Sequence, residues 1–277
     1  MTTGIVTDST AYVPDELVQS LGISVVPVQV IVDGNSYSEV GEISLDEVFD
    51  AVRAGAIVTT SRPAIESFVA AYQELIDRGC DSIVSIHLSK ELSGTYEAAV
   101  IASGRVDIPV TVIDSRLIGM AFGYAVVSAA EMAHAGEHSD VVAAHVIKRC
   151  EKSSITFCVD TLEFLQRGGR IGSVQARVGG VLSVKPLLAM KDGLVQSQEL
   201  VRTSSKAIAR LVEISIKQSK NAQLAVHHVH AAENAEKVAA QLREALKIDA
   251  IPVIEVGAVV GAHVGPGTVA VAISPRS

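Results

Sequence analysis

The sequence predicts an α/β protein in which a parallel-sheet domain precedes an α+β domain with a mostly antiparallel sheet. Up to residue 152, short aliphatic runs alternate with amphipathic segments, as strands and helices do in a parallel sheet covered on both faces. From residue 153 onward, extended runs occur around short turns, which favours antiparallel pairing. We therefore expect an N-terminal α/β domain over residues 1–152 and a C-terminal α+β domain over residues 153–277.

The elements of the first domain follow from hydrophobic periodicity and from helix-start signals. Ser44 and Glu47 have the spacing of a capping box, in which each side chain satisfies a free backbone N–H group at a helix start. The expected strands are residues 5–7, 23–32, 82–87 and 110–113. The expected helices are residues 14–21, 63–78, 118–135 and 141–152, with two more that begin at residue 44 and near residue 93.

The second domain shows fewer helices and more extended runs. We expect a short helical segment between residue 159 and a loop at residues 167–170. The expected strands are residues 155–159, 181–190, 196–202, 224–230, 251–256 and 268–274, and the longer helices are residues 205–219 and 234–246.

Composition narrows the class of function. Hydrophobic residues make up 48% of the 277 residues and charged residues 19%, which suits a large apolar core and excludes a disordered chain. Lys and Arg total 23 against 31 Asp and Glu, and the net charge of −8 argues against a nucleic-acid binder. Aromatic residues make up only 4%, so a stacking platform for single-stranded nucleic acid is not expected.

No segment has the pattern of a secretion signal or of a membrane span. Residues 117–130 lack charge but are too short to cross a bilayer. Residues 256–275 are uncharged but interrupted by Gly and Pro, and we interpret them as two short strands around a Gly-Pro-Gly turn. The cysteines Cys80, Cys150 and Cys158 form no metal-binding spacing and fit a reducing compartment. We expect a cytoplasmic protein without an integral anchor.

Hydroxyl-bearing residues precede two of the expected helices. Thr60 and Ser61 lie before one, and Ser93, Gly94 and Thr95 begin another. Helix N-termini present free N–H groups, and glycine allows a ligand to approach the backbone, so these segments suit a carboxylate or a phosphate. Simple helix capping is the alternative interpretation. The loops at residues 8–10, 60–61, 89–95 and 114–115 lie at junctions of the kind where strands end and helices begin, and we expect them to converge on one site at the carboxyl edge of the parallel sheet.

Several histidines are also candidates. His263 lies in a glycine-rich segment and either donates to an anion or serves as a buried structural residue. In a strand, His228 and His230 would share a face while His227 points the other way, and no carboxylate has a matching spacing. We therefore expect no metal site.

A locally basic segment surrounds two glycines. Arg167 and Arg170 flank Gly168 and Gly169, and Arg177 follows. The segment is either a solvated loop or a docking site for an anionic or acidic partner. Neither a phosphate-binding loop nor a nucleophile elbow around Ser93 is present.

Together these segments resemble the motifs of the bacterial DegV family, in an order and spacing that cover nearly the whole chain. The motifs are Val6-Thr7-Asp8-Ser9-Thr10, Thr60-Ser61-Arg62-Pro63, Leu92-Ser93-Gly94-Thr95-Tyr96, Ile113-Asp114-Ser115, Asp160-Thr161-Leu162-Glu163-Phe164-Leu165, Arg167-Gly168-Gly169-Arg170-Ile171-Gly172, Val184-Lys185-Pro186-Leu187-Leu188 and His263-Val264-Gly265-Pro266-Gly267. One departure is that Arg62 and Ala64 replace the Gln and the second Ser of the family's Thr-Ser-Gln-Pro-Ser.

The resemblance implies a lipid-binding protein that presents a long-chain fatty acid to an ATP-dependent kinase subunit. The N-terminal domain would hold the carboxylate, and the C-terminal domain would form much of an apolar tunnel for the acyl chain. The implied carboxylate site consists of Thr60, Ser93, Gly94 and His263, with Ser61 and Thr95 in support. Arg170, with Arg167, would engage the kinase subunit.

On this view the protein is a binding subunit, not an enzyme by itself, and needs no cofactor beyond the bound lipid. Nucleotide, metal and catalysis would come from the kinase, and contact with a membrane surface would be transient at most. A different interpretation is a serine hydrolase or acyltransferase with Ser93 as nucleophile and His263 as base. A third is a regulator without a lipid ligand.

Overall fold

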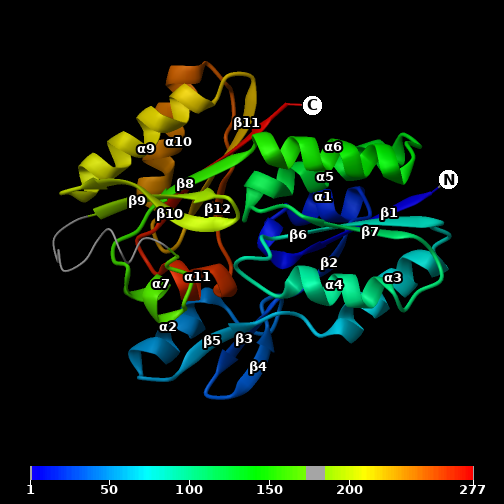
Figure 1. Cartoon of the computed structure of the whole chain (residues 1–277). Helices are drawn as coiled ribbons and strands as arrows, with labels where there is room; N and C mark the ends of the chain where they lie inside the picture. The colour runs from blue at the N-terminus through cyan, green and yellow to red at the C-terminus, as the bar shows by residue number, and fades with distance from the viewer. Residues whose placement is uncertain (1, 173–184, 277) are drawn as a thin grey trace.

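The computed structural model describes residues 2–172 and 185–276. Within these residues the strands form three sheets (Figure 1). The first has the order β2-β1-β6-β7, the second β10-β9-β8-β13-β11-β12 and the third β4-β3-β5. The first two sheets confirm the expected α/β class, with a parallel sheet followed by a mostly antiparallel one.

The first sheet is parallel throughout. Strands β1 and β6 are buried along their whole length, as expected for central strands covered on both faces. Figure 1 shows α3 and α4 on one side of this sheet and α5 and α6 on the other. The elements are β1 (Thr3–Asp8), α1 (Asp15–Ser20), β2 (Ser24–Val26), α3 (Ile65–Asp77), β6 (Ser82–His87), α4 (Thr95–Ser103), β7 (Val110–Asp114), α5 (Met120–His134) and α6 (Ser139–Lys152).

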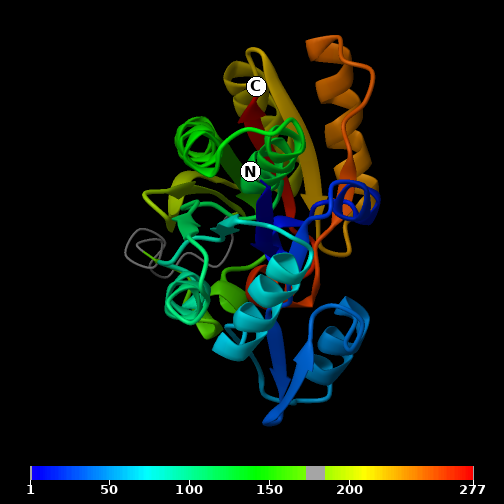
Figure 2. The same ribbon diagram turned by 90° about the vertical axis from the view of Figure 1, so that its right-hand side faces the viewer.

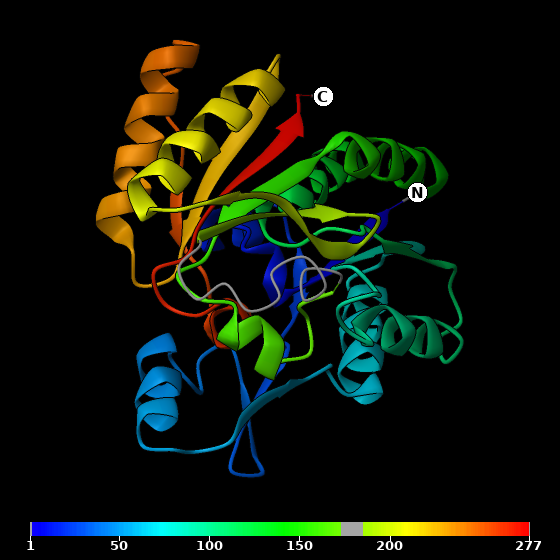
Figure 3. The same ribbon diagram turned by 60° about the vertical axis from the view of Figure 1, so that its left-hand side comes forward.

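The second sheet is antiparallel except where β12 joins β11. Its outer face is covered by α9 and α10 (Figure 3), and its inner face contacts α5 and α6. These two helices therefore lie between the sheets and share one hydrophobic core with both. The elements are β8 (Ser154–Cys158), α7 (Glu163–Arg167), β9 (Lys185–Lys191), β10 (Leu194–Val201), α9 (Ser204–Gln218), β11 (Ala222–His228), α10 (Ala232–Leu246), β12 (Val253–Glu255) and β13 (Val269–Pro275).

The third sheet was not expected. The run at residues 23–32, taken as one strand, is two, because Pro27 lies between them and has no N–H group for a strand ladder. The first part pairs with the parallel sheet and the second begins the antiparallel third sheet, which lies at the lower end of Figure 2. Its elements are β3 (Gln29–Val32), β4 (Asn35–Ser38) and β5 (Val58–Ser61), with α2 (Leu45–Arg53) beside them and the expected capping box at Ser44.

This third sheet corrects the expected position of one loop. Thr60 and Ser61 are part of β5, not of a loop at the carboxyl edge of the parallel sheet. The 3-10 turn η1 (Ser9–Ala11) and residues 89–95 do follow β1 and β6 at that edge. Thr60 therefore reaches the site from a different sheet.

A second correction concerns residues 256–275, expected to be two strands. The first half is instead the helix α11 (Ala258–Val264), and only the second half, β13, is a strand. Ala258, Val259 and Ala262 pack on the third sheet, while Val260 and Val264 pack on a neighbouring apolar cluster. Burial on two sides gives this short segment no alternating pattern, which is why it resembled a buried strand.

Two expectations concern the chain as a whole. Among residues 2–172 and 185–276, no helix is long and apolar enough to cross a membrane. The division at residues 152 and 153 stays a prediction, since α6 ends there but contacts strands of both large sheets. Residues 181–184 of one expected strand, and Arg177, lie outside the described residues.

Candidate ligand-binding site

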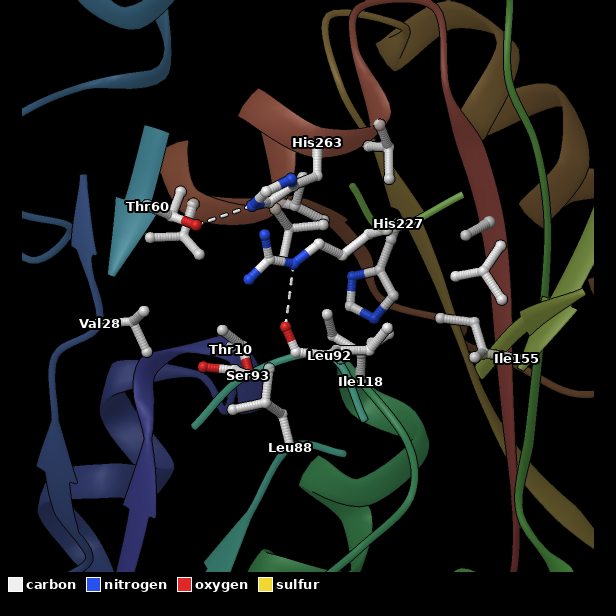
Figure 4. Close-up of a pocket in the computed structure, with 18 of the residues that line it drawn as sticks. Thr10, Val28, Thr60, Leu88, Leu92, Ser93, Ile118, Ile155, His227 and His263 are labelled. Atoms are coloured by element: carbon white, nitrogen blue, oxygen red, sulfur yellow. Dashed lines mark hydrogen bonds between the residues drawn. The ribbon is translucent and has the colours of Figure 1, made fainter. Parts of the chain in front are cut away.

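A cavity lies where the three sheets meet (Figure 4). About 150 Å³ of it is open to the centre of a water molecule, roughly ten times the 10–15 Å³ that one water needs. Among the described residues, its lining includes no Asp or Glu. Most of the wall is apolar: Val28, Leu88, Leu92, Ile118, Ile155, Phe157, Leu165, Met190, Val195, Val229, Val256, Val259, Val260, Val264 and Ala270.

The polar end of the cavity contains a hydroxyl–imidazole pair. The Oγ1 atom of Thr60 and the Nε2 atom of His263 lie 2.7 Å apart, although 203 residues separate them in the sequence. The other ring nitrogen of His263, Nδ1, is buried without a hydrogen-bond partner in the described structure. A buried N–H group without an acceptor is costly, so we place the proton on Nε2. His263 then donates to Thr60, and the Thr60 hydroxyl is free to donate its proton to a ligand.

The surroundings keep His263 neutral. Burial, followed by the positive charges of Arg170 and Arg167, lowers the pKa of His263 from 6.5 to about 4. Gly168 packs directly against the ring, because a Cβ atom added there would lie 2.1 Å from Nδ1. The first glycine of the Arg-Gly-Gly-Arg segment is therefore required by the position of His263.

A carboxylate fixes the start of the helix that carries His263. Glu39, which follows β4, accepts hydrogen bonds from the backbone N–H of Val259 at 3.0 Å and from the Ser9 hydroxyl at 2.5 Å. Burial raises the pKa of Glu39. Gly257 leaves room for this carboxylate, since a Cβ atom there would lie 2.3 Å from Oε1. Glu39 thus joins α11 to the turn after β1 and holds both beside the cavity.

A second pair of hydroxyl groups lies at the start of α4. The Oγ atom of Ser93 and the Oγ1 atom of Thr95 are 2.8 Å apart. Ser93 and Gly94 line the cavity, whereas Thr95 is buried behind them. Thr10 also lines the cavity, but its hydroxyl donates to Asp8 at 2.6 Å, so toward a ligand it offers only an acceptor. The hydroxyl groups of Tyr12, Ser61 and Thr268 also line the cavity but donate to protein oxygen atoms. Thr60 is thus placed to donate to a ligand, and so is Ser93 when Thr95 donates to it.

Two of the predicted arginines differ in position. Arg170 lines the cavity, and its guanidinium donates to the carbonyls of Leu92 at 3.0 Å and Gly168 at 2.7 Å. Arg167 is exposed and lies over the Phe164 ring, 4.9 Å from its centroid. Arg62 is the second arginine in the lining, with its stem against Gly94. The polar end of the cavity is therefore electropositive although the chain is acidic overall.

The structure brings most of the predicted site residues together. Thr60, Ser61, Ser93, Gly94, His263 and Arg170 all line the cavity. Residues 114–115 do not and instead line a second cavity. The sequence interpretation missed Thr10, Arg62, His227 and Met190 as lining residues. The segments containing Thr10 and Arg62 had been singled out, His227 had been considered only for a metal site, and no pattern indicated Met190.

The three neighbouring histidines have separate partners. His227 lines the cavity and accepts from the Met120 N–H at 3.0 Å, and burial lowers its pKa to about 4. His228 lies 3.5 Å from Glu255, and His230 lies 3.0 Å from Asp46. Over the described ranges, no group of three or more His, Cys, Asp or Glu residues could hold a metal ion.

The hydroxyl and imidazole groups are not arranged as a nucleophile and its base. His263 bonds to Thr60 and Ser93 to Thr95, and no hydrogen bond joins Ser93 to His263 in the part of the chain that the structure describes. No carboxylate there contacts Nδ1 of His263. The geometry gives the hydrolase interpretation no support.

Comparisons with known proteins agree with one another. The model of the DegV family, which is described as uncharacterised, matches residues 2–276. A DegV domain-containing protein of Streptomyces coelicolor is 45% identical over 275 residues, which cover 98% of each chain. Protein DegV of Bacillus subtilis is 36% identical, and the match again covers 98% of each chain.

Solved structures show the same fold. A DegV family protein of Thermus thermophilus, described as binding fatty acid, has a TM-score of 0.90 and 33% identity, and the match covers 100% of both chains. DegV of Bacillus subtilis, described as a fatty acid binding protein, has a TM-score of 0.88 and 32% identity, also over 100% of both chains.

Proposed function

This chain belongs to the DegV family, and on that premise we propose that it binds the anion of a long-chain fatty acid in the cavity described above. The carboxylate lies among Thr60, Ser93, Gly94 and His263, and the acyl chain extends between the apolar walls. Thr95 supports Ser93 through the hydrogen bond between their hydroxyl groups, and Ser61 lines the cavity next to Thr60 in β5.

The observation that carries this proposal is the division of one narrow cavity into a donor-rich end and an apolar remainder. Each buried methylene contributes about 0.8 kcal/mol, so the acyl chain supplies most of the binding energy. A bound carboxylate needs hydrogen-bond donors and would be repelled by an acidic side chain. The described lining contains no Asp or Glu. Arg170 lies in the lining and favours an anion, while two of its N–H groups donate to backbone carbonyls.

The proposal has a second step, in which the bound acid is presented to an ATP-dependent kinase subunit that forms the acyl phosphate. Thr60 and Ser93 are neutral, so they orient the carboxylate and leave its oxygen nucleophilic. Arg167 ends α7 and Arg170 lies just after it, beside the proposed head-group site, so a partner docked on them would reach the carboxylate. The protein is then a cytoplasmic lipid-binding subunit without a cofactor of its own.

The first test is mass spectrometry of lipid extracted from the purified protein. We expect a stoichiometric long-chain fatty acid in the extract, and rebinding of one by protein from which the lipid has been removed. Protein that is empty and also fails to take up long-chain acids would contradict the proposal. Turnover of acyl esters together with labelling of Ser93 by a phosphonate would favour the hydrolase interpretation instead.

The second test concerns presentation to the kinase. Arg167→Ala should leave fatty acid binding within about twofold, because the side chain is exposed and lies outside the cavity lining. With the kinase subunit and ATP it should slow acyl phosphate formation about tenfold or more. Equal loss of binding and phosphorylation would contradict the division of roles.

A further inference from the structure

We propose that Met190 sets the longest acyl chain this protein accepts, by closing the end of the cavity that lies opposite Thr60. The inference rests on the proposed function and adds a specificity determinant to it. Two cavities of the described structure meet at this one residue.

A second cavity lies beyond the apolar end of the first. About 360 Å³ of it is open to the centre of a water molecule. It is bordered by the loop after β7, the end of α6 and the turn between β9 and β10. Among the described residues, Met190 alone lines both cavities. Its side chain is therefore a partition between them.

Strand pairing places Met190 at the apolar end of the first cavity. Met190 pairs with Val195 across β9 and β10, and its neighbour Ala189 pairs with Thr156 on β8. Ile155 is the residue before Thr156 on β8, so in this antiparallel pair it lies beside Met190, and Figure 4 shows it on the opposite side of the cavity from Thr60. A chain whose carboxylate lies at Thr60 and Ser93 thus points its methyl end toward Met190.

The two sides of the partition differ in chemistry. The first cavity is apolar near Met190, with Ile155, Phe157 and Val195. The second carries the charged residues Asp114, Arg116, Glu151 and Asp192. If the terminal methyl group of the acyl chain passed Met190, it would lose contact with apolar side chains and lie among charged ones. Burial of the chain is therefore favourable only up to Met190.

The identity of the residue suits this role. Methionine is unbranched and flexible, and it fills irregular gaps without a fixed shape. Met190 is only 9% exposed, so little of it is open to either cavity and the rest is packed against its neighbours. A Leu of similar volume should separate the two cavities as well, whereas Ala should join them and Phe should shorten the first.

The test measures the dissociation constants of saturated fatty acids from 10 to 22 carbons for the wild type and for Met190→Ala, Met190→Phe and Met190→Leu. For the wild type, affinity should rise about fourfold per methylene up to a limiting length and then stop rising. Met190→Ala should move that limit two or more carbons longer, and Met190→Phe should move it shorter. Met190→Leu should leave it within one carbon.

Val195→Ala is the matched control, because Val195 lines the first cavity but not the second. It should weaken binding of the acids that are long enough to reach it and leave the limiting length in place. An unchanged limit in both Met190→Ala and Met190→Phe, with binding retained, would overturn the inference while the proposed function stands. No binding of any acid by the wild type would overturn the proposed function itself.

Discussion

Two histidine–hydroxyl pairs in this protein have the same separation and opposite surroundings. His263 and Thr60 face the cavity, with 2.7 Å between nitrogen and oxygen. His87 and Ser85 also lie 2.7 Å apart, but both side chains are fully buried within the parallel sheet. The pair that faces the cavity has no carboxylate partner among the described residues, whereas His87 has one in Asp8 at 3.1 Å.

The buried pair belongs to a continuous network. Asp8 also accepts from the backbone N–H of Leu88 at 3.0 Å and from Thr10, while Tyr72 donates to Ser85 at 2.9 Å. Burial raises the pKa of Tyr72 to about 12, so the phenol stays protonated.

Residue types alone therefore do not identify a reactive site. An Asp, a His and a Ser in hydrogen-bonded sequence are the components of a hydrolytic triad, yet here the serine is inaccessible. The network instead connects β1 to β6 and positions Thr10 beside the cavity. The accessible pair, without a carboxylate, suits binding and not nucleophilic attack.

The largest expected effect comes from breaking the buried network. Asp8→Ala leaves His87 and two backbone N–H groups without an acceptor, so it should lower the free energy of unfolding by about 2–4 kcal/mol. Urea denaturation followed by circular dichroism measures this. A loss below about 1 kcal/mol would mean that the network contributes little to stability.

The second effect is a dependence of stability on pH. The pKa values of His227 and His263 are lowered in the folded protein from 6.5 to about 4, so the unfolded chain binds more protons between these pH values. Stability should therefore fall on acidification through this window, by about 1.4 kcal/mol per pH unit for each histidine. His263→Gln should reduce that slope, and an unchanged slope would contradict the neutral state assigned to His263.

The third effect concerns the glycine beside the accessible pair. Gly168→Ala places a methyl group where Nδ1 of His263 lies, so it should displace the ring and weaken fatty acid binding about tenfold. Gly169→Ala is the control, since nothing lies within 4 Å of its added Cβ and its φ of +68° costs only folding stability. Equal weakening of binding by both variants would contradict the role of Gly168.

The smallest effect is on stability at the accessible pair itself. Thr60→Val removes one hydrogen bond at the cavity wall and should change the free energy of unfolding by no more than about 1 kcal/mol. Thermal denaturation measures this change. A loss as large as that of Asp8→Ala would show that the two pairs are equally structural and would erase the contrast between them.

Local signals were enough to predict some of these features. The capping box at Ser44 and Glu47 and the strand at residues 82–87 depend on neighbouring residues, and both are confirmed. The order of the motifs indicated the family. Contacts between distant residues were not predictable from periodicity, and Thr60 with His263 is the clearest case. The helix α11 was missed because tertiary burial decides the conformation of its seven residues.

Titration of palmitate into lipid-free protein, measured by calorimetry, tests the carboxylate site most directly. We expect one molecule bound per chain, and a loss of affinity of about a hundredfold or more in the double variant Thr60→Val, Ser93→Ala, which lacks both hydroxyl donors. Thr59→Val with Ser103→Ala is the matched control, because Thr59 is exposed, Ser103 is half-buried, and both lie outside the cavity lining. Wild-type affinity in the first double variant, or no binding by the wild type, would contradict the account.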